Sequence, residues 1–252
     1  MKILSLGWGV QSFTLAAMVA LGELEPIDYA IHADTTHESK LTYEFVKRWG
    51  GWLEERGVKL ITVENKQQVL QPLKSGKYVV DIPAFTASEK GDGQTRRQCT
   101  LDWKIANIRR WLQLNRNKQP VEQWLGISLD EFQRMKDSDV KYITHRWPLI
   151  EKRMTRADCI NWLDRRGLEV PPKSACTFCP YHSTAEWRRI KQTPEDWSEA
   201  VAVDEAIRKA RPPYDLFIHP SRKPLTEVDL RTSEEKGQLS LWDLECAGIC
   251  GV

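Results

Sequence analysis

The segment Gly7-Trp8-Gly9-Val10-Gln11-Ser12 places two glycines, an amide and a hydroxyl directly after the apolar run Lys2-Ile3-Leu4-Ser5-Leu6. A strand that enters a glycine turn and leaves as a helix points backbone N–H groups at one spot, where the helix dipole adds partial positive charge. We therefore predict an anion site here, with a tight turn that binds nothing as the alternative. The segment matches neither Gly-x-x-x-x-Gly-Lys-Ser/Thr nor Gly-x-Gly-x-x-Gly, since no such lysine follows and position 12 is Ser.

Sulfur is the second source of chemistry. The chain has six cysteines, at positions 99, 159, 176, 179, 246 and 250. Disulfides are not expected in a chain of this size in a reducing compartment, so Cys176-x-x-Cys179 fits half of a zinc site, a redox pair or half of an iron–sulfur site. Cys159 lies one helical turn from Leu163 on an apolar face, which predicts a buried core position.

The elements that position these groups alternate between strand and helix over residues 1–65. We predict strands at 2–6, 27–33 and 58–63 and helices at 11–21 and 39–56, the second helix ending at Gly57. This order implies a parallel sheet with right-handed crossovers. Ligands of such sheets bind beyond the carboxyl ends of the strands, where the glycine loop and Asp34-Thr35-Thr36-His37 both lie.

Further along the chain the signals are more local. Residues 84–98 are polar and predict a mobile loop or lid, followed by a helix at 101–114 and a strand at 124–127. Thr155 and Asp158 resemble a capping box for a helix that ends at Gly167. Residues 183–210 predict helix, and 211–240 predict irregular structure.

The composition is that of a soluble globular protein, with 252 residues, 41% hydrophobic and 29% charged. No run of about 18 apolar residues is present, and we find no signal-peptide pattern, so we expect a cytoplasmic protein. The net charge of +2 excludes no partner class. Paired basic residues fit either solvated helix faces or a polyanion-binding surface; they lie at 96–97, 109–110, 152–153, 165–166 and 188–189.

Three segments together resemble a known superfamily. The loop 7–12 is similar to the Ser-Gly-Gly-x-Asp-Ser loop of the adenine-nucleotide α-hydrolase (PP-loop ATP pyrophosphatase) superfamily, which includes the PAPS and APS reductases. Asp34-Thr35, followed by Glu38 and Thr42-Tyr43, resembles its Asp-Thr-Gly motif and the helix after it. Arg97-Gln98-Cys99 with Lys104 resembles its cysteine-containing segment. The resemblance covers residues 1–180 and departs at Gly7 and Trp8, where Ser and Gly are usual.

The resemblance implies an α/β fold, a Rossmann-like (HUP-type) parallel sheet with helices on both faces, and a mostly helical or irregular C-terminal region. We expect an adenine-nucleotide-binding domain at 1–170 and a C-terminal region at 171–252. The nucleotide would be ATP with Mg²⁺, or PAPS or APS. The residues expected to bind it are Ser5, Leu6, Gly7, Trp8, Gly9, Gln11, Ser12, Asp34, Thr35, Arg97 and Lys104.

The resemblance also favours a [4Fe–4S] cluster, with zinc and structural or redox thiols as alternatives. Cys99, Cys176 and Cys179 match three ligand positions, and Cys250 is the expected fourth. Glu245-Cys246 resembles the start of the C-terminal Glu-Cys-Gly segment of sulfonucleotide reductases, so Cys246 is the expected reactive thiol. The roles of Cys246 and Cys250 can be exchanged, and a tail without function is the further alternative.

Two reactions are compatible with these features. In the first, a substrate oxygen is adenylated by ATP and a cysteine-bound or cluster-bound sulfur displaces AMP, with a nucleic acid or nucleotide as acceptor and a separate sulfur donor. In the second, Cys246 attacks the sulfur of PAPS or APS, and sulfite is released after reduction by a thioredoxin-like partner. A nucleotide-binding module with a structural metal and no catalysis is the third hypothesis. We expect no membrane partner.

Overall fold

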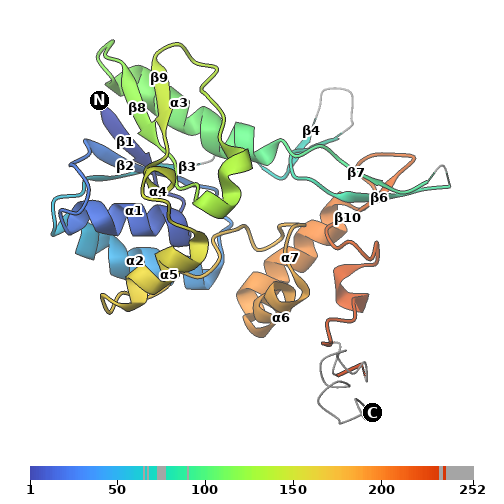
Figure 1. Ribbon diagram of the computed structural model, residues 1–252. Helices are drawn as coiled ribbons and strands as arrows, with labels where there is room; N and C mark the ends of the chain where they lie inside the picture. Colours follow the sequence, from blue (N-terminus) through green and yellow to red (C-terminus); the bar gives the residue numbers. More distant parts are fainter. Residues whose placement is uncertain (65, 67, 73–77, 90, 233–234, 237–252) are drawn as a thin grey trace, which may run out of the picture. The chain divides into compact units, whose positions relative to one another are not determined.

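The computed structural model describes residues 1–64, 66, 68–72, 78–89, 91–232 and 235–236 (Figure 1). The chain divides into two compact units. Unit 1 comprises Met1–Gln68 and Gln98–Cys176, and unit 2 comprises Val69–Arg97 and Thr177–Val252. The sequence-based division at residue 170 had placed 69–97 in the first domain. These residues join unit 2 because β6 (Phe85–Ala87) pairs with β10 (Asp215–Phe217), far along the chain.

Unit 1 contains the alternating strands and helices that the sequence predicts. In chain order its elements are β1 (Lys2–Ser5), α1 (Val10–Ala20), β2 (Tyr29–Asp34), α2 (Lys40–Glu54), β3 (Leu60–Glu64), the π-helical turn η1 (Thr100–Ile105), α3 (Ala106–Asn115), β8 (Val121–Trp124), the 3₁₀ helix η2 (Leu129–Arg134), β9 (Ile143–Arg146), α4 (Pro148–Glu151) and α5 (Arg156–Asp164).

The sheet of unit 1 is parallel throughout, in the order β3-β2-β1-β8-β9. The chain runs outward from β1 to β3 and then returns to the other side of β1 with β8. The strand order therefore reverses between β1 and β8, and ligands of open α/β sheets bind at such a reversal.

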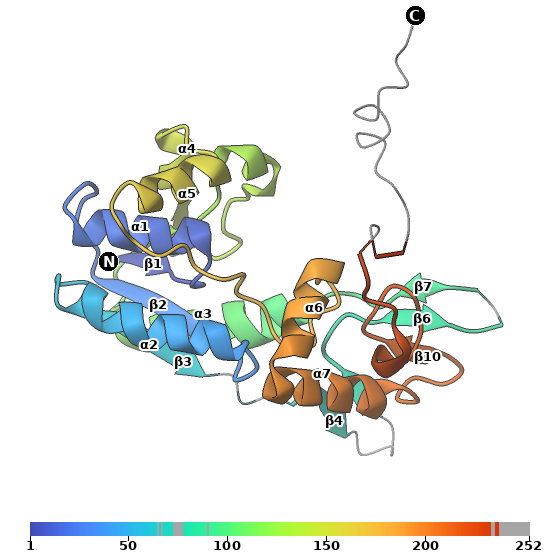
Figure 2. The same cartoon turned by 90° about the horizontal axis from the view of Figure 1, so that it is seen from below.

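Helices cover both faces of this sheet (Figure 2). Successive β1 residues point to opposite faces, so Leu4 packs with residues of α1, α2 and α5, whereas Ile3 packs with Ile108 and Leu112 of α3. Cys159 of α5 is fully buried in the first of these cores, as predicted. The predicted Rossmann-like arrangement is confirmed.

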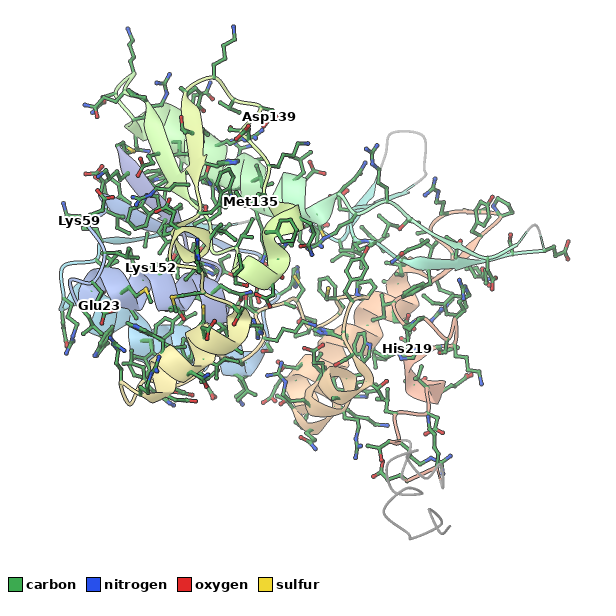
Figure 3. All side chains as sticks on the ribbon, viewed as in Figure 1. Glu23, Lys59, Met135, Asp139, Lys152 and His219 are labelled. Carbon is green, nitrogen blue, oxygen red and sulfur yellow. The ribbon has the colours of Figure 1, made fainter. Side chains whose placement is uncertain are left out.

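Several local predictions are confirmed at the ends of helices. Thr155 and Asp158 form the predicted capping box of α5. Gly57 and Gly167 both adopt positive φ, at 83° and 65°, as glycines that follow helices commonly do. Glu23, labelled in Figure 3, joins the loop after α1 to α5, because its carboxylate accepts a 3.0 Å hydrogen bond from Trp162 Nε1 and pairs with Arg166.

The helix expected at 101–114 is present, and its first turns, η1, are π-helical before the helix continues as α3. Two other local predictions were wrong. The strand expected at 124–127 lies at 121–124, because a hydrogen bond from Ile127 N to Leu125 O turns the chain at Gly126. The segment 84–98, expected as a loop, contains β6 and β7 (Gly93–Gln94), which pair in an antiparallel hairpin.

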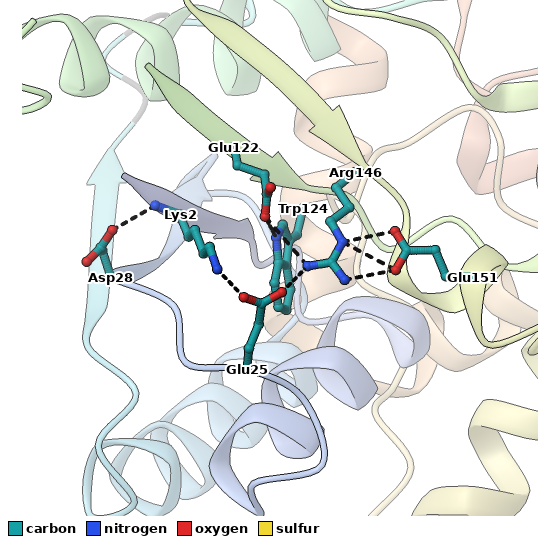
Figure 4. Close-up of polar contacts among 7 residues, drawn as sticks. All are labelled: Lys2, Glu25, Asp28, Glu122, Trp124, Arg146 and Glu151. Atoms are coloured by element: carbon teal, nitrogen blue, oxygen red, sulfur yellow. Dashed lines mark hydrogen bonds and ion pairs between the residues drawn. The ribbon is translucent and has the colours of Figure 1, made fainter. Parts of the chain in front are cut away.

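A polar network ties the edge of the sheet to its connections (Figure 4). Arg146 at the end of β9 pairs with Glu25 and with Glu151 of α4, the latter at 2.9 Å, and its guanidinium lies 4.8 Å from the ring centre of Trp124. Lys2 of β1 pairs with the same Glu25. The network joins β1, β8 and β9 to segments outside the sheet.

Unit 2 is smaller and built from short elements. In chain order they are β4 (Leu70–Pro72), β5 (Tyr78–Val80), β6, β7, α6 (Thr184–Gln192), α7 (Pro194–Ile207), β10 and the 3₁₀ helix η3 (Leu225–Glu227). The strands form a β10-β6-β7 sheet and a separate β4-β5 pair. In the part of the chain that the structure describes, no helix has the length and apolarity needed to cross a membrane.

Candidate functional site

The predicted anion loop lies where the strand order reverses, between the ends of β1 and β8. Gly9 is the N-cap of α1, and among the described residues no side chain caps this helix. The first turn of α1 contains no acidic residue, so its backbone N–H groups and the helix dipole can act on an external anion.

Gly126, which follows β8, sets the position of this loop. A Cβ atom built on Gly126 would lie 2.8 Å from Ser12 N and 3.0 Å from Ser12 Cα. Both neighbours are backbone atoms, which cannot move aside as a flexible side chain can. Gly126 therefore allows the turn after β8 to pack directly against the first turn of α1.

Trp8 adopts the left-handed conformation that glycine normally supplies, with φ of 56°. Its side chain is 2% exposed and packs against Phe13, His32 and Phe45, with ring centres 6.2 to 6.4 Å away. Burial of the indole offsets the backbone strain, which is of order 1–3 kcal/mol. Because the side chain lies in the core, only the backbone of Trp8 is available to a ligand of the loop.

The polar side chains of the loop are held by neighbours. Gln11 donates to Glu131 Oε2 at 2.9 Å and accepts from Arg156 Nη1 at 2.9 Å. Ser12 Oγ donates to Gly9 O at 3.2 Å, and Ser5 Oγ accepts from Gln123 at 2.7 Å. These contacts fix the loop from both sides.

The loop after β2 is also constrained. Asp34 Oδ1 accepts hydrogen bonds from Thr36 N at 2.8 Å and from Tyr43 Oη at 2.9 Å. Burial and the neighbouring Asp34 carboxylate raise the pKa of Tyr43 above its usual range, so the phenol stays protonated as the donor. Thr36, like Trp8, has a positive φ, of 62°. Left-handed non-glycine residues thus stand in both loops.

A cavity of about 200 Å³ opens at the carboxyl ends of β1, β2 and β8. Most of its lining is apolar, with a few polar groups. It is lined by Ser5, Leu6, Gly7, Ile31, His32, Ala33, Lys104, Ile105, Ile108, Gln123 and Leu125.

His32 is buried on the wall of this cavity. Its Nδ1 lies 3.1 Å from Leu6 O, and because a carbonyl oxygen can only accept, Nδ1 carries the proton. Burial lowers the pKa of His32, with the neighbouring carboxylates of Glu38 and Asp34 opposing the effect. The imidazole is therefore a neutral group at the wall of the cavity near pH 7.

A group of polar side chains that includes Cys176 lies beside the loop after β2. Cys176 Sγ lies 3.3 Å from the hydroxyl of the fully buried Thr35. Glu38, whose side chain has no exposed surface, forms a 3.1 Å ion pair with Lys104 and accepts a 3.2 Å hydrogen bond from Ser174 Oγ. The structure thus brings together Thr35, Lys104 and Cys176, three of the residues predicted from the sequence.

Lys104 also interacts electrostatically with Cys99. Burial acts to lower its pKa, but Glu38, Cys176 and Cys99 together outweigh that effect and raise the pKa above the ordinary value. Lys104 is therefore a charged ammonium that lines the cavity and lies near the two cysteines.

Other predicted residues are placed elsewhere. Arg97 and Cys179 belong to unit 2, where the Arg97 guanidinium lies 5.3 Å from the ring centre of Tyr181. Cys246 and Cys250 lie outside the described residues, so the predictions about the tail stay predictions.

The chemistry of the cysteines fits a thiophilic metal such as zinc or iron. The described cysteines, including Cys99, Cys176 and Cys179, are thiols rather than half-cystines, and thiolate sulfur is a ligand that zinc and iron both accept. Within the described ranges, no three His, Cys, Asp or Glu side chains are grouped as a metal site.

Several residues that shape the site were not expected as site residues. Glu38 and His32 are buried and Ser174 is half-buried, and a single sequence gives little sign that a polar residue is buried. Gly126 did carry a signal, a glycine at the end of a strand, which often marks close backbone approach.

No protein-family model and no curated protein matches this chain. Among solved structures, it is similar in fold to the phosphoadenylyl-sulfate (PAPS) reductase from Candida auris in its phosphate complex, with 13% identity over 72% of this chain and 82% of that chain and a TM-score of 0.47. It is also similar in fold to the U34-tRNA thiolase NcsA from Methanococcus maripaludis with its [4Fe-4S] cluster, with 14% identity over 83% of this chain and 72% of that chain and a TM-score of 0.42.

Proposed function

We propose that unit 1 binds an adenine nucleotide and that the protein uses it for adenylation-dependent sulfur transfer to a nucleic acid or nucleotide. The observation that carries this proposal is the position of Cys176, whose sulfur contacts Thr35 beside Lys104, a residue that also lines the cavity. Lys104 thus lies beside both Cys176 and the cavity that we propose as the nucleotide site.

Two features of unit 1 support a nucleotide as the ligand. The uncapped start of α1 suits phosphate oxygens. The neighbouring cavity offers apolar walls for a planar base and a few polar groups, among them His32 and Gln123, to orient it. Lys104 supplies a positive charge at the cavity wall for the phosphates.

The reaction would proceed in two steps. The acceptor oxygen attacks the α-phosphorus of ATP, the bond from that phosphorus to the bridging oxygen breaks, and pyrophosphate leaves. A sulfur donor at the sulfide level then attacks the activated carbon, and AMP departs with the electron pair of the carbon–oxygen bond. Oxygen is exchanged for sulfur without net oxidation or reduction. The amides of the α1 N-terminus and the Lys104 ammonium would stabilise the charge that develops on the phosphates.

In this proposal Cys99, Cys176, Cys179 and Cys250 would hold a [4Fe–4S] cluster or zinc. When bound, such a group supplies a Lewis-acidic or redox-active centre that can hold sulfur. Protein purified without oxygen is expected to be brown and to contain iron. Colourless protein that contains one equivalent of zinc would contradict the iron–sulfur cluster and would indicate a zinc site instead.

The reaction is tested by supplying labelled ATP, PAPS and APS separately to the purified protein, with sulfide and with or without RNA or DNA. We expect AMP and pyrophosphate from ATP, dependent on the nucleic acid, and thiolated product. The Cys176→Ser variant is expected to lose turnover, whereas Cys159→Ala, which changes a cysteine buried in the core of unit 1, retains it.

The other outcomes separate the alternatives. Sulfite released from PAPS or APS would overturn sulfur transfer in favour of a sulfonucleotide reductase. Nucleotide binding without any product, unaffected by Cys246→Ala, would indicate a binding module without catalysis.

A further inference from the structure

Glu38 is a buried carboxylate that the proposed reaction does not use directly. It follows β2, its side chain has no exposed surface, and both of its oxygens have partners. Oε1 accepts from Lys104 Nζ at 3.1 Å, and Oε2 accepts from Ser174 Oγ at 3.2 Å. Its backbone also forms an antiparallel bridge with Cys176. One residue therefore joins the β2 loop, η1 and the segment that ends at Cys176.

A carboxylate in this position is costly to bury unless it is paired. Lys104 provides the pairing charge, and in return its position is set by Glu38. The lysine side chain is 34% exposed, against none for Glu38, so the lysine could reach solvent if its partner were removed. Glu38 is thus immobilised by burial, and the position of the Lys104 side chain depends on its ion pair with Glu38.

Lys104 lies beside both the cavity and the cysteines. It lines the 200 Å³ cavity, and it lies close enough to Cys176 and Cys99 to interact electrostatically with both. A lysine free to rotate would spend part of its time away from the cavity and the thiols.

We propose that Glu38 is a positioning residue that fixes the Lys104 ammonium between the cavity and Cys176. Glu38 does not contact the ligand, because both of its oxygens are engaged within the protein. It acts on ligand binding through Lys104. The identity of the ligand as an adenine nucleotide rests on the function proposed above, whereas the holding of Lys104 does not.

The proposal is tested by a double-mutant cycle on the full chain, with the dissociation constant for Mg-ATP measured for each protein. Glu38→Gln, Lys104→Gln and the double variant are compared with the wild type. Glu44→Gln, which changes an exposed acid on α2, is the matched control. We expect Glu38→Gln and Lys104→Gln each to weaken binding about tenfold. The double variant is expected to bind no more weakly than Lys104→Gln alone.

Losses that multiply in the double variant would show that Glu38 acts independently of Lys104 and would overturn the proposal, as would unchanged binding in Glu38→Gln. If Glu38→Gln does not fold, Glu38→Asp, which withdraws the carboxylate by one methylene, is measured in the same cycle with the same expected direction.

A second measurement does not depend on any nucleotide. The rate at which an amine-acetylating reagent modifies Lys104 is followed by peptide mass spectrometry. Release from Glu38 is expected to raise this rate about tenfold in Glu38→Gln and to leave it unchanged in Glu44→Gln. An unchanged rate in Glu38→Gln would overturn the positioning role. If the wild type does not bind ATP but the acetylation rate rises, the proposed function fails and the positioning role stands.

Discussion

At the scale of single residues, Gly126 is the position where the site tolerates least change. Replacement by Ala would place a methyl group 2.8 Å from the backbone nitrogen of Ser12. The turn after β8 and the start of α1 would have to separate. We expect Gly126→Ala to lower the free energy of unfolding by about 1–3 kcal/mol, measured by urea denaturation, and to weaken ATP binding because the α1 amides are displaced.

Gly51 provides the matched control. It is an exposed glycine inside α2 whose added Cβ would meet no atom within 4 Å. Gly51→Ala is expected to raise the free energy of unfolding by up to about 1 kcal/mol, through helix propensity alone. If both variants lose stability equally, close packing at Gly126 is not the cause.

The residues of the site were predictable from sequence to different degrees. Thr35, Lys104 and Cys176 are recognisable because each lies in a motif, and the structure brings them together. Glu38 lies in the motif-like segment that follows Asp34-Thr35, but its role depends on a contact with Ser174, 136 residues away, which no local pattern predicts. Trp8 shows a further limit, since a left-handed tryptophan is possible only when a core has room for its ring.

At the scale of elements, Asp204 holds unit 2 together. Its carboxylate is 1% exposed and pairs with Arg208 of the same region. It also accepts 3.0 Å hydrogen bonds from the backbone nitrogens of Ile218 and Leu225. The side chain thereby joins α7 to the segments around β10 and η3.

We expect Asp204→Asn to destabilise unit 2 by about 3 kcal/mol, because the amide cannot accept from all of these donors and Arg208 loses its partner. Hydrogen exchange of α7 and β10 amides measures this loss. Glu205→Gln, at the neighbouring exposed position, is expected to change exchange little. Equal exchange in both variants would mean that Asp204 does not anchor these segments.

Helices and strands that are determined by neighbouring residues were predicted well from the sequence. Strands that depend on pairing with distant segments were not. The strands and helices of residues 1–65 follow from hydrophobic periodicity, glycines and turns, all of which act over a few residues. The β6–β7 hairpin was missed because its polar, glycine-containing sequence is typical of a loop, and its order comes from pairing with β10. The π-helical form of η1 likewise has no signal in its own residues.

At the scale of the whole molecule, two histidines, the buried His32 and the half-buried His219, make stability depend on pH. Burial lowers the pKa of both His32 in unit 1 and His219 in unit 2, which is labelled in Figure 3. An unfolded histidine binds a proton below its ordinary pKa of about 6.5, whereas these two resist protonation in the folded state. The unfolded state therefore gains protons first, and stability falls as the pH drops below about 6.5.

His32→Asn keeps a donor for Leu6 O but does not titrate. We expect hydrogen exchange of the β2 amides to accelerate between pH 7.5 and 5.5 in the wild type, after correction for intrinsic exchange, and to accelerate less in His32→Asn. His145→Asn, on β9, should behave as the wild type does. A wild-type response retained in full by His32→Asn would assign the pH dependence to other groups.

Calorimetric titration with ATP and GTP tests most directly whether the carboxyl ends of β1, β2 and β8 bind an adenine nucleotide, as we propose. We expect saturable binding of Mg-ATP to the wild type, competition by AMP, at least about tenfold weaker binding of GTP, and a marked loss of ATP affinity in Gly126→Ala. Absence of ATP binding, or equal affinity for ATP and GTP that Gly126→Ala leaves unchanged, would contradict this proposal.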